Sequence, residues 1–151
     1  MGLDSFIVAR RKDNPEIEIE LYYERKFFEL DSVLRKGTEV PNEEYEYYVT
    51  LDQLKKIESD MGEFGKTVLT MSDIELKLCS ENLGALLKLS KWQDNLPLIL
   101  SEDDDDSWAL SDNETYCKAI KMREFLEFVH IFYNIWESGK DKWDFIYISS
   151  F

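Results

Sequence analysis

Strand-like sequence stands at both ends of the chain with helix-like sequence between, and this arrangement constrains the fold more than any other feature. Near the start, SFIVARR predicts a first strand. EIEIELYY then alternates strictly, with Ile17, Ile19 and Leu21 on one side and glutamates on the other. The turn signal DNP, which ends at Pro15, separates the two segments. Residues 3–22 therefore predict a hairpin with a half-buried second strand, although a helix beginning at Pro15 is also compatible with the sequence.

The last residues, WDFIYISSF, predict a buried strand. Aromatic residues from Trp143 to Tyr147 occupy every second position, and isoleucines alternate with them, which is typical of a strand covered on both faces. Before this strand, apolar residues at helical spacing predict a long central helix near 112–138 that is apolar on more than one side. Strands at both ends and helices between them predict an α+β fold, in which helices pack on an antiparallel or mixed sheet.

Capping residues and turn signals mark the elements in the middle of the chain. Helical spacing begins at Tyr23 and ends before Gly37, so the change from strand to helix is expected near Tyr22. Capping-box patterns predict a short helix over 51–59 and another from residue 73. EEYEYYVT alternates and predicts a strand, NLGALLKLSKW predicts a helix, and LPLIL predicts an extended segment.

Length and composition indicate one globular domain over residues 1–151. The chain is 44% hydrophobic and 14% aromatic, enough for a substantial core, and its apolar runs are too short to cross a membrane. Basic residues follow the first apolar residues, which is the reverse of a signal peptide. Cys79 and Cys117 stand alone, so we expect reduced thiols in a cytoplasmic protein, with Cys117 packed in the core.

The sequence offers little support for catalysis. His130 is the only histidine, which excludes most histidine-based catalytic pairs and multi-histidine metal sites, and we expect it to face solvent or a partner. The stretch GEFGKT, residues 62–67, resembles the end of a phosphate-binding loop. However, Asp60 stands where the first glycine is needed, so a Gly-rich turn is predicted instead. We expect no catalytic residue and no cofactor, and we favour a non-enzymatic protein.

The net charge of −14 is concentrated in residues 13–60 and 101–115. A nucleic-acid-binding protein needs basic residues that displace the counterions of the phosphates, and the chain has only the short basic cluster 10–12. Direct binding to nucleic acid is therefore disfavoured. The acidic field is compatible with a protein partner that has a basic surface.

Four consecutive aspartates, 103–106, invite comparison with a calcium loop. With Asp103 at the first position, acceptable ligands follow at Asp105 and at the later positions through Glu114. The sixth position requires glycine but holds Trp108, which disfavours an EF-hand. We predict no dedicated metal site, with Asp103 and Asp105 as candidates for weak cation binding only. The alternative is an acidic bend that leads into a helix capped by Ser111 and Glu114.

Both ends of the chain resemble a known group of proteins. The opening MGLD runs directly into an apolar strand, YYERK precedes an aromatic helix, YYVTLDQLKKI joins a strand to a capped helix, and the chain ends in DFIYISSF. This pattern is similar to small, uncharacterised proteins encoded by bacteriophages, which begin Met-Gly-Leu-Asp and end in an aromatic strand followed by Ser-Ser-aromatic. The similarity covers both ends and the first third, while residues 61–140 match little. It implies an accessory protein of a bacteriophage, with a T4-like phage as a source, in the cytoplasm of its bacterial host.

These features predict a phage accessory protein that binds a host or phage protein through acidic surface. Mimicry of DNA phosphates is a special form of this hypothesis and needs carboxylates spread over one face. The candidate partner-binding residues are Glu16, Glu18, Glu20, Asp103, Asp104, Asp105 and Asp106. The alternative is a protein or enzyme that binds a small molecule or nucleotide in a pocket lined by Trp92, Trp108, Tyr116 and Trp143.

Overall fold

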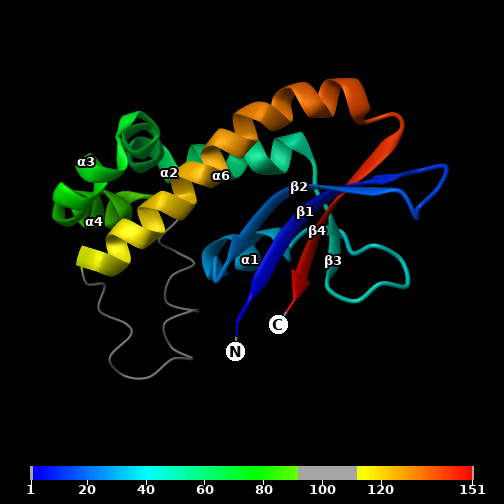
Figure 1. The fold of residues 1–151 in the computed structure, drawn as a ribbon, viewed down its shortest axis with the longest axis horizontal. Helices are drawn as coiled ribbons and strands as arrows, with labels where there is room; N and C mark the ends of the chain where they lie inside the picture. The colour runs from blue at the N-terminus through cyan, green and yellow to red at the C-terminus, as the bar shows by residue number, and fades with distance from the viewer. Residues whose placement is uncertain (1, 92–111, 151) are drawn as a thin grey trace. The chain divides into compact units, whose positions relative to one another are not determined.

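The computed structural model describes residues 2–91 and 112–150, which form an α+β fold (Figure 1). The strands are β1 (Asp4–Arg11), β2 (Glu18–Arg25), β3 (Glu46–Tyr48) and β4 (Trp143–Ser150), and they form one antiparallel sheet in the order β2-β1-β4-β3. The helices are α1 (Phe28–Leu34), α2 (Leu51–Thr70), α3 (Asp73–Leu78), α4 (Ser80–Leu89) and α6 (Asp112–Gly139). The predicted fold class is confirmed, including the two terminal strands and the long helix.

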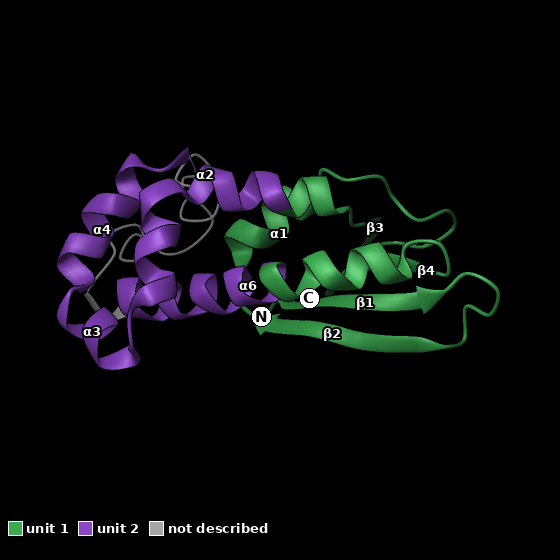
Figure 2. Ribbon diagram, turned by 90° about the horizontal axis from the view of Figure 1, so that it is seen from above, with its two compact units in different colours: residues 1–54, 130–151 green, residues 55–129 purple. Residues whose placement is uncertain are grey.

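The chain divides into two compact units (Figure 2). The first unit comprises Met1–Leu54 and His130–Phe151, and it contains the sheet, α1 and the C-terminal residues of α6. The second unit comprises Lys55–Val129, with most of α2, all of α3 and α4, and the remainder of α6. None of the helices in the described ranges has the length and apolar character that a membrane crossing requires. The single domain expected from length stays a prediction.

In the first unit, β1 and β4 form the centre of the sheet. Alternate residues of β1 from Ser5 to Ala9 face the same side as their partners on β4, and α1 and the end of α6 pack on that side. Phe132 of α6 contacts Phe145 edge-on, with ring centroids 5.0 Å apart. We call this side the covered face. The side with Phe6 and Arg10 is the outer face.

Strand β2 forms the predicted hairpin with β1. The alternative prediction, a helix that begins at Pro15, is therefore wrong. Ile7 lies opposite Tyr22 while Val8 lies opposite Glu20, so Leu21 is the extra residue of a β-bulge. The bulge places Tyr22 on the covered face, where it is buried. The strand then continues to Arg25, so the predicted change to helix near Tyr22 is wrong, because pairing with β1 prevails over the helical spacing that begins at Tyr23.

In the second unit, α2 continues beyond the predicted end at Ser59, and the predicted Gly-rich turn is wrong except at Gly62. There the backbone has φ 55° and ψ −134°, which is not helical, so α2 consists of two helical segments joined by a kink at Gly62. Gly65 lies in the second segment and packs closely: an added Cβ would lie 3.1 Å from the Met61 Cβ and 3.2 Å from the Leu126 Cδ1. The capping box between Ser72 and Glu75 begins α3 as predicted.

Two glycines in the helices of the second unit, Gly62 and Gly84, should respond to substitution with opposite signs. Gly62→Ala should lower the free energy of unfolding by about 1–2 kcal/mol, because a Cβ is disfavoured at positive φ. Gly84→Ala in α4 should raise it by roughly 0.5–1 kcal/mol, because alanine is the better helix former and its Cβ would be 3.8 Å from the Thr115 Oγ1. Urea unfolding of both variants measures the difference. Equal shifts would contradict this assignment of the two glycines.

Candidate functional site

The predicted acidic residues of the hairpin lie at an exposed edge of the sheet. Glu18 and Glu20 are on the outer face of β2, and Glu16 is in the turn before it. Glu18 is neutralised by Arg10, whose Nη2 lies 2.8 Å from the Glu18 Oε2, and the same guanidinium also pairs with Glu46. Glu16 and Glu20 are exposed and make no ion pair with any residue that the structure describes. Their charges are the uncompensated part of this site.

The isoleucines that alternate with these glutamates are also exposed. Ile17 is 45% and Ile19 is 49% accessible, so the predicted half-buried strand is wrong over its first half. Ile17 and Ile19 are exposed because β2 lies at the edge of the sheet. The aromatic rings of α6 contact Phe145 on β4, which is a central strand. We call residues 16–20 the β2 surface. It combines an acidic side with an apolar side.

The basic cluster 10–12 is paired within the protein. Besides the contacts of Arg10, the Arg11 Nε lies 2.9 Å from the Asp13 Oδ1, and the Lys12 Nζ lies 4.0 Å from the Asp144 Oδ1. Burial opposes the charge of Arg10, but its hydrogen bonds with Glu46 and Glu18 raise its pKa above the ordinary value, so it remains a cation. The cluster therefore supplies counterions to acidic residues of the same unit.

Residues 101–111 of the second acidic segment lie outside the described residues. This applies to the partner-binding candidates Asp103, Asp104, Asp105 and Asp106, to the cation candidates among them, and to the LPLIL segment. Within residues 2–91 and 112–150, no group of three His, Cys, Asp or Glu side chains is arranged to hold a metal ion. The candidate site is thus defined by the β2 surface alone.

The aromatic residues of the alternative hypothesis have separate surroundings. Trp92 and Trp108 lie outside the described ranges. Tyr116 belongs to the second unit, where the Lys77 Nζ lies 5.1 Å from its ring centroid. Trp143 belongs to the first unit, where the Arg11 guanidinium lies 5.5 Å from its ring. Both rings are in contact with a cation of their own unit, a common structural arrangement.

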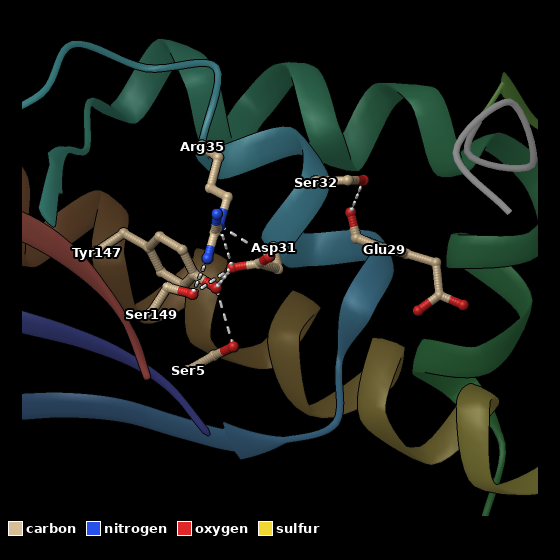
Figure 3. Close-up of polar contacts among 7 residues, drawn as sticks. All are labelled: Ser5, Glu29, Asp31, Ser32, Arg35, Tyr147 and Ser149. Atoms are coloured by element: carbon tan, nitrogen blue, oxygen red, sulfur yellow. Dashed lines mark hydrogen bonds and ion pairs between the residues drawn. The ribbon is translucent and has the colours of Figure 1, made fainter. Parts of the chain in front are cut away.

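A buried polar network in the first unit was not anticipated from sequence (Figure 3). The Asp31 Oδ1 accepts hydrogen bonds from the Tyr147 hydroxyl at 2.5 Å, the Ser149 hydroxyl at 2.8 Å and the Arg35 Nε at 3.1 Å. The Ser5 hydroxyl lies 2.9 Å from the Tyr147 hydroxyl, and the Arg35 Nη2 donates to the Ser149 Oγ at 2.9 Å. The network joins α1 to the two central strands.

This network stabilises the fold and is closed to a substrate. Tyr147 and Ser5 are completely buried, and Asp31 is only 7% accessible. Burial and the neighbouring Asp31 carboxylate raise the pKa of Tyr147, so its hydroxyl stays protonated and donates to that carboxylate. The sequence contained one local signal, the i,i+4 pair Asp31 and Arg35, but nothing in it indicated the three hydroxyls that complete the network.

Four further side chains carry titratable or reactive groups. His130 is exposed, as predicted, and lies beside the Tyr133 ring at 6.0 Å between centroids. Cys79 and Cys117 are free thiols, but Cys117 is exposed on α6, so its predicted place in the core is wrong. Burial, with a smaller contribution from Lys121, lowers the pKa of Lys118 to about 8. Burial and a like charge account for this shift, and we assign no activity to it.

No protein-family model, no curated protein and no solved structure matches the chain. The geometry of the β2 surface is therefore the structural basis from which a function can be proposed.

Proposed function

We propose that this chain is a non-enzymatic protein that binds a basic segment of a partner protein on the β2 surface. The observation that carries the proposal is the pair of uncompensated charges at Glu16 and Glu20, which flank the exposed side chains of Ile17 and Ile19. Apolar contact supplies binding energy, and the carboxylates select a partner of opposite charge.

The charge of the whole chain supports the same kind of partner. A net charge of −14 produces a field that attracts basic proteins and accelerates their association. The basic cluster 10–12, the one feature that favoured an acidic ligand in the sequence, is already paired with Glu18, Asp13 and Asp144. A basic partner would therefore meet no unpaired cluster of positive charges on the hairpin.

The biological setting is part of the proposal and is supported by the resemblance alone. A bacteriophage accessory protein, from a T4-like phage, would act in the cytoplasm of the bacterial host. Its partner would then be a host protein or another phage protein with a basic segment. DNA mimicry is a narrower form of this proposal, and it would require the aspartates 103–106 to share a face with the β2 surface.

The charges of Glu16 and Glu20 should control capture of the partner. Each exposed ion pair contributes about 0.2–1 kcal/mol, so the double variant Glu16→Gln/Glu20→Gln should weaken binding by roughly 2- to 30-fold. Immobilised wild-type and variant proteins can be compared in pull-downs from bacterial lysate at low and high salt. A partner bound through this surface should be retained by the wild type at low salt and lost at high salt.

Glu43→Gln/Glu44→Gln is the matched control, since both residues are exposed in the same unit and lie outside the strands. It removes the same number of charges and should retain the partner as the wild type does. Equal loss in both double variants would show that only net charge matters, and recovery of no salt-sensitive partner would overturn the proposal.

A further inference from the structure

We infer that the partner segment binds as an additional β-strand along the outer edge of β2, and that this segment alternates basic and apolar residues. The inference rests on the proposed function, because it specifies how the β2 surface holds its partner. Strand addition uses backbone hydrogen bonds for affinity and alternate side chains for specificity. Both requirements can be examined on this edge.

The backbone of β2 has an outward-facing row of hydrogen-bonding groups. β2 is at one end of the sheet, and no strand among the described residues pairs with its outer side. The Arg11 N–H donates to the Ile17 carbonyl at 2.9 Å, and β1 pairs Ala9 with Ile19. The Ile17 N–H donates to the Asn14 carbonyl in the turn. Since antiparallel ladders alternate, the Ile17 C=O and the N–H and C=O groups of Ile19 face β1, and those of Glu18 and Glu20 face outward.

The side chains beside this edge define the chemistry of the segment. An added strand would place one set of its residues on the outer face, next to Glu20 and to Glu18, which already pairs with Arg10, and the other set next to Ile17 and Ile19. Opposite charges in neighbouring strands attract and apolar pairs exclude water, so the first set should be lysine or arginine and the second valine or isoleucine. The bulge at Leu21 limits the regular edge to the β2 surface, so the segment is short.

A second copy of the chain is a poor occupant of the same edge. Pairing of two β2 strands would bring glutamates of one copy beside glutamates of the other, and like charges in directly opposed positions destabilise a sheet. Charge and a bulge are the devices by which proteins protect edge strands from self-association. The same acidic edge remains open to a strand of opposite charge.

The test uses the full chain and five synthetic peptides of equal length. The probe alternates Lys and Val, the second alternates Glu and Val, and the third has the same composition as the probe with its lysines in one block. The fourth and fifth are the probe N-methylated at alternate residues in its two possible phases. Each of them lacks one edge of backbone donors but keeps every charge and side chain. NMR titration measures affinity, and amide hydrogen exchange measures protection of the Glu18 and Glu20 amides.

We expect the probe to bind and to slow exchange of the Glu18 and Glu20 amides by about tenfold or more. The Ile19 amide, which already faces β1, should change little. The Glu-Val peptide should not bind, and one of the two possible N-methylation phases of the probe should abolish binding.

Tight binding of the lysine-block and N-methylated peptides, without amide protection, would overturn strand addition but retain the proposed function. Failure of every basic peptide to bind, while the pull-down yields a partner, would also overturn strand addition. Failure in both experiments would overturn the two proposals together.

Discussion

Replacement of Asp31 by alanine is expected to lower the free energy of unfolding by roughly 3 kcal/mol. The substitution leaves the hydroxyls of Tyr147 and Ser149 without their acceptor and Arg35 without its carboxylate. Removal of one partner of a buried ion pair costs about 3–5 kcal/mol, and we take the lower end because the Arg35 side chain is 29% accessible. Urea unfolding followed by circular dichroism measures the loss.

Two variants provide the controls for this experiment. Tyr147→Phe removes one hydroxyl but keeps the Asp31–Arg35 pair, so it should cost only about 1–2 kcal/mol. Ser32→Ala, one residue further along α1, removes a hydroxyl that donates to the Glu29 carbonyl and should cost less than about 1 kcal/mol. A loss for Asp31→Ala no larger than that for Ser32→Ala would show that the network does not stabilise the first unit.

The second large effect is expected in alkaline solution. The pKa of Tyr147 is raised in the folded protein by burial and by the Asp31 carboxylate, whereas in the unfolded chain it has its ordinary value near 10.0. Below pH 10 both states keep the proton, and the stabilisation from the hydroxyl is present in full. Above pH 10 the unfolded state releases the proton while the folded state retains it, so the free energy of unfolding falls by about 1.4 kcal/mol per pH unit.

Tyr147→Phe isolates this contribution from that of other groups that titrate in the same range. The difference in unfolding free energy between wild type and Tyr147→Phe should be constant from pH 7 to about pH 9.5 and should decrease steadily above pH 10. Urea unfolding at intervals of pH measures both curves. Parallel curves up to pH 11 would mean that Tyr147 titrates with an ordinary pKa and is not held in the neutral state.

The candidate site was partly predictable from the sequence. The alternation of Glu18 and Glu20 with Ile17 and Ile19 is present in the structure, because period-two patterning is a property of the extended backbone itself. The exposure of the isoleucines was not predictable, since an identical pattern occurs in strands with one covered face. The pairing of Arg10 with both Glu18 and Glu46 was also hidden, because Glu46 is 36 residues away.

Local patterns in the amino-acid sequence were sufficient to predict the α+β class, the terminal strands and the long helix. Apolar periodicity decides which face of a segment can be buried, and capping residues such as Ser72 satisfy backbone groups at the helix ends. The strand order, the bulge at Leu21 and the network around Asp31 became known only from the folded structure. These features depend on contacts such as Ser5 with Tyr147, which are separated by 142 residues, and no local pattern encodes which distant side chain will complete a hydrogen bond.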